Sequence, residues 1–376
     1  MNVTVNASLD EDVGVAGGTL TVDLRALRDN YSNLVRRSAQ AITAAVVKAD
    51  AYGLGAAQVS RVLYADGCRT FFVAHFVEAV RLRPTLPRDA AIYVLNGLQP
   101  GNEAIAAKAG VVPILNSAVQ ARNWLATART LDITLPAAIQ ADTGMSRLGM
   151  AEQEVAEVLR LPGFRERLEI KYLLSHLACA DDHTNVLNQK QLEAMSRVAA
   201  MLPDIPVSFA NSGGIFLGGD YLGALTRPGI SLYGGAATSG HPNAMKPVVR
   251  LGVRVIQVRT VPAGTAVGYG GAHVTAREAR LATISAGYAD GLPRNLGNGG
   301  AAYYGDIRLP IVGRVSMDSL SIDVTSLPAN TLSLGSQVEL IGPHQSLEQI
   351  ADAADTISYE ILTRLGQRYR RNYIQS

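Results

Sequence analysis

The chain has 376 residues, of which 48% are apolar and 18% are charged, enough to build the cores of about two domains. Its 34 basic and 32 acidic side chains give a net charge of +2, which gives no reason to expect nucleic acid or an anionic membrane as a partner. The only cysteines, Cys68 and Cys179, form no CxxC pair, which argues against a disulfide framework or a zinc cluster.

Residues 1–14 are polar and acidic, without the apolar stretch that is typical of a secretion signal. No apolar run in the chain approaches the ~20 residues that a membrane-spanning helix needs. We therefore expect a cytoplasmic protein that has no membrane partner.

Between residues 19 and 235, short apolar runs rich in β-branched residues alternate with stretches of helical periodicity. Eight runs have this character: 41–47, 71–76, 91–97, 111–117, 133–142, 170–178, 206–212 and 225–234. Continuously apolar runs are typical of parallel strands that are covered on both faces. Eight such units in about 200 residues predict an α/β fold with an N-terminal (β/α)8 (TIM) barrel over residues 15–242. The alternative, an open doubly wound sheet, predicts a GxGxxG turn after the first strand, which "KADAYGLG" does not match.

After residue 245, strand-like runs follow one another at short spacing, separated by Gly, Pro and Asn. This pattern predicts a mainly antiparallel β domain over residues 243–376, with residues 1–14 as a candidate to pack against it. Near the end, Ser346 and Gln349 form the spacing of a capping box, which predicts a helix that begins there.

The active site of such a barrel lies at the carboxyl ends of its strands, here called the barrel mouth. The following residues, all but Met145 polar, lie at these ends of the predicted strands: Lys48, Asp142, Thr143, Met145, Arg147, Ser175, His176, Asn211, Ser212 and Arg227. A lysine at the end of an apolar strand is suited to covalent catalysis, because burial favours its neutral amine. Glycine-rich turns such as "NSGG" allow backbone N–H groups to approach a phosphate. Together these features indicate pyridoxal 5'-phosphate (PLP) as cofactor, and the lack of an acidic cluster gives no support for a metal.

The stretch "AVVKADAYGLG" resembles the signature of alanine racemases, which are PLP enzymes of fold type III. Eight further segments resemble blocks of that family in order and at compatible spacing: "DTGMSRLGM", "SHLA", "ANSGG", "RPGISLYG", "VGYGGAHVT", "AGYADGLPR", "VGRVSMD" and "TISYEIL". The resemblance covers essentially the whole chain. It implies interconversion of L- and D-alanine, supply of D-alanine for peptidoglycan, and a homodimer with shared active sites.

The resemblance assigns two catalytic bases. Lys48 resembles the lysine that binds PLP covalently and moves the α-proton on one face of the substrate. Tyr269 resembles the base on the opposite face, contributed by the other subunit, and two opposed bases are what inversion requires. In the family, a hydrogen-bonded chain runs from this tyrosine through a histidine to an arginine, at the positions of His176 and Arg227.

Arg227 resembles the arginine that faces the pyridine nitrogen of PLP. Arginine keeps its proton with a pKa above ~12, so the ring nitrogen is expected to stay unprotonated. The uncharged ring is a weaker electron sink, which limits side reactions such as transamination.

The resemblance also implies the remaining contacts. Residues expected to bind the cofactor, mostly its phosphate, are Tyr52, Asn211, Ser212, Gly229, Ile230 and Tyr359. Residues expected to bind or admit the substrate are Arg147, Met317, Asp318 and Tyr288, of which Arg147 also contacts the cofactor.

Three positions depart from a common pattern of the family. Many members carry a carbamate-modified lysine seven residues before Arg147, where this chain has Gln140. An inorganic anion or another group replaces the carbamate, or Arg147 is held less firmly. Ser316 and Leu54 stand where cysteine and histidine are common, which we interpret as tolerated variation.

Three alternative functions remain. A fold type III decarboxylase predicts a carboxylate near the ring nitrogen, where this chain has Arg227. A broad-specificity racemase shares the fold, but such enzymes often carry a secretion signal. A single-barrel PLP-binding regulatory protein lacks both the β domain and Tyr269.

Overall fold

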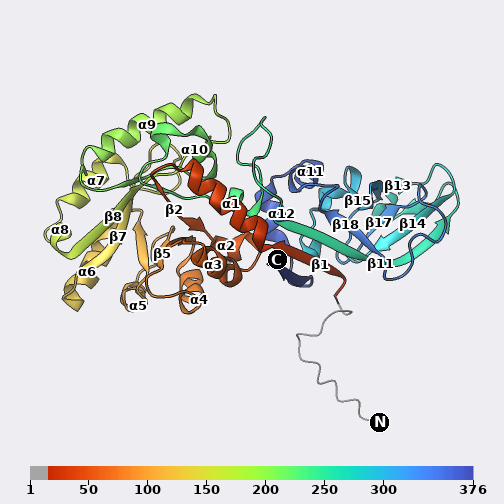
Figure 1. Ribbon diagram of the computed structural model, residues 1–376, viewed down its shortest axis with the longest axis horizontal. Helices are drawn as coiled ribbons and strands as arrows, with labels where there is room; N and C mark the ends of the chain where they lie inside the picture. Colours follow the sequence, from red (N-terminus) through yellow and green to blue (C-terminus); the bar gives the residue numbers. More distant parts are fainter. Residues whose placement is uncertain (1–15, 376) are drawn as a thin grey trace, which may run out of the picture. The chain divides into compact units, whose positions relative to one another are not determined.

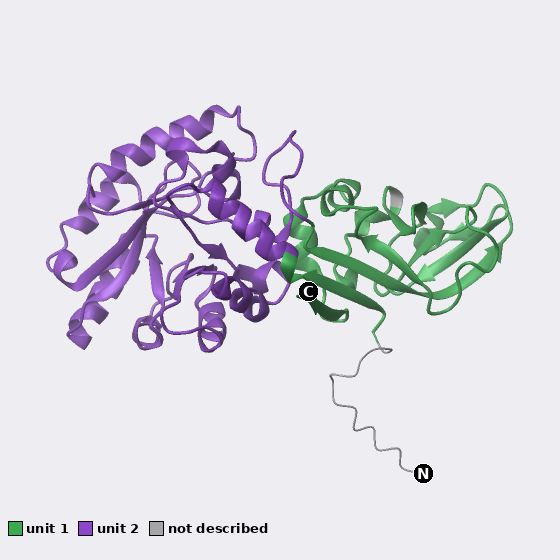
Figure 2. Cartoon of the chain, in the orientation of Figure 1, with its two compact units in different colours: residues 1–25, 247–376 green, residues 26–246 purple. Residues whose placement is uncertain are grey.

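The computed structural model describes residues 16–375, except for the side chain of Asn298. These residues form two compact units (Figure 1, Figure 2): the barrel unit comprises residues 26–246, and the β unit comprises residues 16–25 and 247–375. Each unit has its own sheets and its own apolar core.

The barrel unit alternates short parallel strands with helices. Its strands are β2 (Ile42–Thr43), β3 (Ala45–Val46), β4 (Thr70–Val73), β5 (Ala91–Val94), β6 (Val112–Leu115), β7 (Leu135–Gln140), β8 (Leu168–Leu174), β9 (Val207–Ser208) and β10 (Leu225–Thr226). Its helices are α1 (Leu24–Arg37, which begins just before the unit), α2 (Lys48–Tyr52), α3 (Ala56–Ala65), α4 (Phe76–Leu82), α5 (Glu103–Ala109), α6 (Ala118–Leu131), α7 (Glu152–Leu159), α8 (Phe164–Arg167), α9 (Val186–Ala199) and α10 (Ser212–Leu217). The 3-10 turns are η2 (Arg83–Thr85), η3 (Gly219–Tyr221) and η4 (Ile230–Tyr233).

Backbone hydrogen bonds close these strands into a ring. Strands β3 to β9 form a parallel sheet in sequence order, and β10 pairs in parallel with β2, which leads directly into β3. Between β9 and β10, the Ala224 N–H donates to the Val207 carbonyl at 2.7 Å, and the Arg227 N–H donates to the Ala210 carbonyl at 2.8 Å. The predicted barrel is therefore confirmed, and each of the eight predicted runs overlaps a strand of it.

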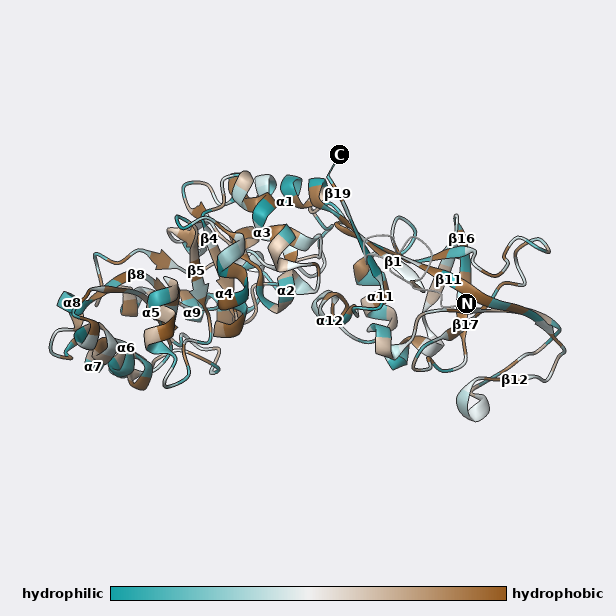
Figure 3. Cartoon of the chain, turned by 90° about the horizontal axis from the view of Figure 1, so that it is seen from below, coloured by the Kyte–Doolittle hydropathy of each residue, from teal (hydrophilic) through white to brown (hydrophobic). Residues whose placement is uncertain are grey.

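Amphipathic helices cover the barrel, and α6 illustrates how. Its buried residues Ala121, Trp124, Leu125 and Ala128 recur at helical spacing, and the Ser117 hydroxyl caps its first turn by accepting from the Gln120 N–H. The helices of this unit accordingly carry both hydrophobic and hydrophilic residues (Figure 3). In the described part of the chain, no helix has both the length and the hydropathy that crossing a membrane requires.

The β unit contains one sheet of eight strands, part of which closes into a ring, and a separate sheet of two strands. Its strands are β1 (Gly18–Asp23), β11 (Val249–Val261), β12 (Ala266–Val267), β13 (His273–Val274), β14 (Ala279–Ile284), β15 (Ala301–Tyr304), β16 (Ile307–Val312), β17 (Leu320–Asp323), β18 (Gln337–Ile341) and β19 (Arg370–Ile374). The order of the eight-stranded sheet is β14-β17-β16-β15-β18-β11-β1-β19, and an additional β14–β11 pairing closes its first six strands into a ring. Strands β12 and β13 form the two-stranded sheet. All pairs of the eight-stranded sheet are antiparallel except β1–β19, in agreement with the predicted antiparallel β domain.

Short helical segments complete the β unit: η5 (Tyr269–Gly271), η6 (Tyr288–Asp290), η7 (Arg294–Asn298), α11 (Leu347–Ala353) and α12 (Ser358–Arg364). The predicted capping box is confirmed at the start of α11. The Ser346 hydroxyl accepts from the Gln349 N–H at 3.2 Å, and the Gln349 side chain accepts from the Ser346 N–H at 2.7 Å.

The limits of the units differ from the predicted boundaries, 15–242 and 243–376. Residues 16–25 belong to the β unit, because β1 pairs with both β11 and β19 through its backbone. At the other limit, the barrel unit extends to Lys246. The proposal that residues 1–14 pack with the β domain falls outside the described residues.

Candidate active site

Lys48 is separated from the end of β3 by one residue and begins a turn of left-handed helix. The four residues after it, 49–52, have φ angles between 51° and 55°, although none of them is glycine. Each such residue costs roughly 1–2 kcal/mol relative to a right-handed conformation, so the surrounding contacts must hold the turn. Inside the turn, the Gly53 N–H donates to the Ala49 carbonyl at 2.8 Å. The turn also buries Ala51 and Tyr52, which anchors it to the barrel.

The surroundings of Lys48 lower the pKa of its amine. Burial is the largest cause, followed by the positive charge of Arg147, and Arg227 adds to the effect. The Glu78 carboxylate opposes it. The neutral amine, which is the nucleophilic and basic form, is therefore more accessible than in an ordinary lysine.

His176 follows β8 and lies close to the same cations. Burial is the main reason that its pKa is lowered to about 3, and the charges of Arg227, Lys48 and Arg147 add to the effect. The imidazole is therefore neutral near pH 7, with one ring nitrogen able to donate and the other able to accept a hydrogen bond.

The low pKa of His176 predicts a pH-dependent stability. The unfolded chain binds this proton near pH 6.5, whereas the folded chain binds it only near pH 3. The contribution of His176 to the free energy of unfolding is therefore fully present above pH 6.5 and is lost as the pH decreases from about 6.5 toward 3. The slope for this one group is about 1.4 kcal/mol per pH unit. We expect His176→Gln to flatten the dependence of the melting temperature on pH between 7 and 4. The exposed His183→Gln serves as the control, and an equal effect of both variants would contradict the assignment.

Arg227 is buried at the end of β10 and is bound by neutral acceptors. Its guanidinium donates to the Ser208 carbonyl at 2.7 Å, to the Ser208 hydroxyl at 2.5 Å and to the Ser175 carbonyl at 2.5 Å. The ring of Phe72 lies 6.0 Å away. Burial lowers the pKa of Arg227 to about 10, below the ordinary arginine value assumed from the sequence. Arg227 still keeps its charge near neutral pH. The prediction that the ring nitrogen of PLP stays unprotonated depends on this charge.

Hydroxyl and backbone N–H groups gather beside this arginine. The Ser212 hydroxyl accepts from the Gly229 N–H at 2.9 Å and from the Ser231 N–H at 3.4 Å. A Cβ atom on Gly229 would lie 2.3 Å from the Tyr52 hydroxyl oxygen, so the phenol approaches the backbone here. Tyr52 itself is buried against Tyr233, with ring centroids 4.7 Å apart. We call the group of Tyr52, Ser212, Gly229 and Ile230 the cradle.

Asn211 supports the cradle through contacts with the protein itself. Its side-chain oxygen accepts from the Gly214 N–H at 2.9 Å and caps α10, while its amide donates to the Leu177 carbonyl at 3.2 Å. These contacts fix the start of α10, where Ser212 lies.

Arg147 is presented by a closed loop between β7 and α7. The Asp142 carboxylate accepts from three N–H groups of residues 144–146 at 2.9 to 3.1 Å, and the Met150 N–H donates to the Gln140 carbonyl at 2.8 Å. The Gln140 amide donates to the Leu148 carbonyl at 3.2 Å. Among residues 16–375, Arg147 has no hydrogen-bond or ion-pair partner and is exposed. Gln140 thus holds the loop backbone rather than the guanidinium.

The predicted site residues of the β unit are exposed side chains. Tyr269 lies on η5 with 72% of its surface exposed, and Met317, Tyr288 and Tyr359 are also exposed. The structure brings Tyr288 and Met317 together, because the N–H groups of Tyr288 and Ala289 donate to the carbonyls of Ser316 and Met317. The Asp318 carboxylate accepts from Arg368 at 2.7 Å, so it is engaged in an ion pair.

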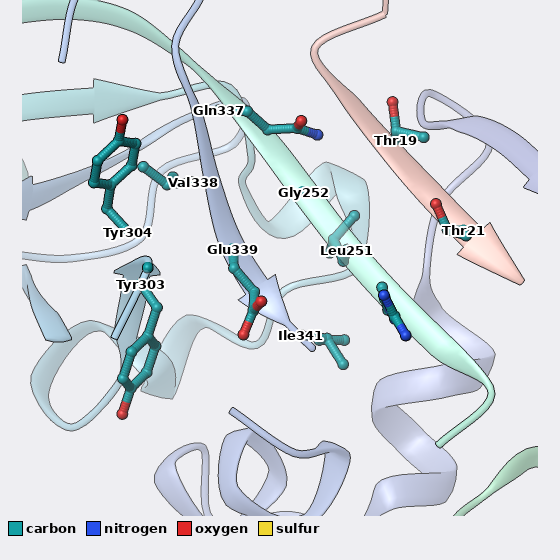
Figure 4. Close-up of a pocket in the computed structure, with 12 residues that line it drawn as sticks. Thr19, Thr21, Leu251, Gly252, Tyr303, Tyr304, Gln337, Val338, Glu339 and Ile341 are labelled. Atoms are coloured by element: carbon teal, nitrogen blue, oxygen red, sulfur yellow. The ribbon is translucent and has the colours of Figure 1, made fainter. Parts of the chain in front are cut away.

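A groove of the β unit contains none of the predicted site residues (Figure 4). It has a volume of about 450 Å³ and lies over β1, β11, β15 and β18. Its polar lining includes Thr21, Arg250, Tyr303 and Glu339. The groove offers neither a lysine nor a glycine-rich turn next to a hydroxyl, so it does not compete with the barrel mouth as a PLP site.

Two family models together cover nearly the whole chain. Residues 22–237 match the N-terminal domain of alanine racemase, and residues 248–373 match its C-terminal domain. The chain belongs to the alanine racemase family. The resemblance inferred from the sequence motifs is therefore confirmed.

Bacterial proteins named alanine racemase are similar to this chain over nearly its full length. A catabolic alanine racemase of Rhizobium johnstonii is 59% identical over 95% of this chain and 95% of its own. An alanine racemase of Brucella abortus is 54% identical over 98% of this chain and 96% of its own.

Solved alanine racemases share the fold. The crystal structure of the Bartonella henselae enzyme, which has covalently bound pyridoxal phosphate, is 47% identical and covers 96% of this chain and 100% of its own, with a TM-score of 0.91. The biosynthetic alanine racemase of Pseudomonas aeruginosa is 35% identical, with the same coverage and a TM-score of 0.86.

One residue that supports the alanine racemase motifs, Gln191, was not found from the sequence, although its neighbours Thr143 and Ser175 were among the predicted residues of the barrel mouth. Gln191 of α9 donates to the His176 carbonyl at 2.9 Å and to the Thr143 hydroxyl at 3.2 Å, and Thr143 bonds the Ser175 hydroxyl at 2.7 Å. These three polar side chains are buried. Ser208, the partner of Arg227, was also missed. Serine and glutamine in such positions resemble ordinary surface residues in sequence, and only their burial distinguishes them.

Proposed function

We propose that this protein is a PLP-dependent alanine racemase that interconverts L- and D-alanine. The observation that carries the proposal is the convergence at the barrel mouth of Lys48 with two arginines, a neutral imidazole and the cradle. When bound, PLP supplies the electron withdrawal that makes the α-proton of an amino acid removable.

The residues of the barrel mouth fit this cofactor. The cradle combines hydroxyls with backbone N–H groups and includes a glycine whose Cβ would collide with Tyr52, as expected for a phosphate that approaches the backbone closely. We propose that Lys48 binds PLP covalently, that the cradle and Tyr359 hold its phosphate, and that Asn211 orients α10. Arg147 is proposed to bind the phenolic oxygen of the cofactor and the substrate carboxylate.

Arg227 and His176 are proposed to set the electronic properties of the site. The charged guanidinium carries N–H donors and no acceptor, and it keeps its proton near neutral pH. It would therefore donate a hydrogen bond to the ring nitrogen of PLP and leave that nitrogen unprotonated. The neutral imidazole is proposed to connect Arg227 with Tyr269. The decarboxylase alternative requires an acid at the position of Arg227.

The proton transfers are assigned to Lys48 and Tyr269. We propose that Lys48 removes or returns the α-proton on one face of the substrate and that Tyr269 of the partner subunit does so on the other. Met317, Asp318 and Tyr288 are proposed to line the substrate entrance, together with Tyr359. The protein is therefore proposed to act as a homodimer in which each site draws on both subunits.

A racemisation assay of the purified protein tests this function. L-alanine and a panel of other L-amino acids are incubated with and without added PLP, and the enantiomers are then separated. We expect a visible absorbance band with PLP and the fastest inversion with alanine. Inversion of many amino acids at similar rates would favour the broad-specificity alternative, and carbon dioxide release would favour the decarboxylase.

The physiological role is a separate part of the proposal. We propose that the enzyme works in the cytoplasm and supplies D-alanine for peptidoglycan. The relative from Rhizobium johnstonii is named a catabolic alanine racemase, so a role in the breakdown of alanine is the alternative. A deletion strain that requires added D-alanine for growth would support the role in peptidoglycan synthesis. A deletion strain that grows normally except when alanine is the carbon source would support the role in alanine breakdown.

Replacement of Gly229 by alanine is expected to weaken PLP binding at least about tenfold. The added Cβ would lie 2.3 Å from the Tyr52 hydroxyl oxygen and 3.0 Å from its ring carbon, so the phenol must leave its place in the cradle. Titration of the cofactor-free protein with PLP, followed by absorbance, measures the change. An unchanged dissociation constant would contradict the assignment of the cradle.

A further inference from the structure

Glu78 makes three hydrogen bonds to backbone N–H groups next to Lys48. One carboxylate oxygen, Oε1, accepts from the Ala49 N–H at 2.6 Å. The other, Oε2, accepts from the N–H groups of Ala74 and His75, both at 2.8 Å. Ala49 is bonded directly to Lys48, and residues 74–75 follow β4, the strand beside β3. A single side chain therefore links the backbone after Lys48 to the neighbouring strand.

The left-handed turn explains why such a link matters. Residues 49–52 adopt a conformation that is unfavourable for alanine, aspartate and tyrosine, so external contacts must maintain it. The bond to Glu78 holds the first residue of the turn from outside. Its geometry fixes the direction in which the chain leaves Lys48, and with it the position of the amine.

We propose that Glu78 is a positioning residue that clamps the turn after Lys48 and thereby holds the lysine amine in place. The role of Glu78 in catalysis rests on the function proposed above. Its effect on the conformation of residues 49–52 is independent of that function.

The clamp requires a carboxylate of this length. Both oxygens must accept, because N–H groups face each of them. In glutamine one oxygen becomes an NH2 group, which can only donate and would face an N–H donor. Aspartate is shorter by one methylene and cannot span the same distance between β4 and the turn. Both substitutions therefore leave backbone donors unpaired.

Glu78 also counters the cations around Lys48. Arg147 and Arg227 lower the pKa of the amine, His176 lies in the same cluster as a neutral imidazole, and the Glu78 carboxylate raises the pKa. Loss of this carboxylate is expected to lower the pKa of Lys48 further. A residue that only stabilised the fold would leave this pKa unchanged.

The test compares Glu78→Gln with a matched control, Glu154→Gln. Glu154 of α7 accepts from the backbone N–H of Ala118 at 2.7 Å, so it also joins neighbouring segments of the barrel unit through a carboxylate. Two measurements are made on the full-length proteins. The first is hydrogen–deuterium exchange of the segment 47–54, and the second is the pH dependence of kcat for alanine racemisation, which reports groups of the substrate complex.

In Glu78→Gln we expect exchange in segment 47–54 to be roughly tenfold faster or more, since a charge-assisted hydrogen bond is lost. We expect kcat to fall roughly tenfold to a hundredfold because the amine is misplaced. The limb of the pH profile that reports loss of a proton from Lys48 should move to lower pH. Glu154→Gln should leave both the exchange in this segment and the profile as in the wild type.

Unchanged exchange in segment 47–54 would overturn the proposal, as would an unshifted pH profile or an equal effect of Glu154→Gln on either measurement. If the wild-type protein does not racemise alanine, the proposed function fails. The exchange measurement still decides whether Glu78 holds the turn.

Discussion

Substitution of Lys48 by alanine is expected to lower alanine racemisation by about ten-thousandfold or more and to abolish the visible absorbance band of bound PLP. The variant loses a covalent anchor and one of two proposed bases at once, and removal of such a group costs several orders of magnitude in rate. Chiral chromatography of alanine and an absorbance spectrum measure the two effects.

The control for this experiment is Lys171→Ala. Lys171 lies on β8 in the same unit, but its exposed amine forms an ion pair with Glu169 at the surface. This variant should keep both the absorbance band and the rate. If Lys48→Ala retained the band and a rate within tenfold of the wild type, Lys48 would not be the residue that binds the cofactor.

Substitution of Tyr269 by phenylalanine is expected to lower racemisation about a thousandfold or more while leaving PLP bound. The ring remains, but the group that takes and returns a proton is lost. Because Lys48 still serves one face, exchange of the α-proton with solvent should persist for one enantiomer of alanine only. Proton NMR in deuterium oxide follows this exchange for each enantiomer separately.

Tyr304→Phe is the matched control, because Tyr304 is another partly exposed tyrosine of the β unit outside the predicted site. It should leave racemisation unchanged. Equal residual exchange of both enantiomers in Tyr269→Phe would contradict the assignment of opposed bases.

Mixing the two inactive variants tests whether a site draws on two subunits. In random dimers of Lys48→Ala and Tyr269→Phe chains, half of the dimers are mixed, and each mixed dimer has one site with both intact residues. We therefore expect recovery of about a quarter of the wild-type activity after co-refolding. Without recovery, Lys48 and Tyr269 of one site would have to come from the same chain.

The barrel could be predicted because its signal is local. Each strand appears as an apolar run of its own, and the residues that end the runs lie at the mouth by the geometry of the fold. Strand β1 could not be assigned in this way. Its partners β11 and β19 lie more than two hundred residues later, so sequence order alone placed it with the barrel.

The chemical groups of the site were predictable, whereas the contacts that hold them were not. Lys48, Arg227 and Ser212 stand in recognisable motifs. The left-handed turn contains no glycine between residues 49 and 52, so nothing in its composition indicates positive φ angles. Glu78 and Gln191 bind mainly backbone atoms, which any residue supplies, and such contacts leave no sequence pattern.

The positive charge at the barrel mouth has a consequence for the stability of the folded chain. Arg147 and Arg227 lie near Lys48, and Arg227 is bound by uncharged acceptors, so folding gathers cations that repel one another. An anionic occupant relieves this repulsion and binds only the folded chain, which stabilises that state by mass action. The supply of pyridoxal phosphate would thereby control how long the folded chain survives proteolysis, in addition to how fast it turns over alanine.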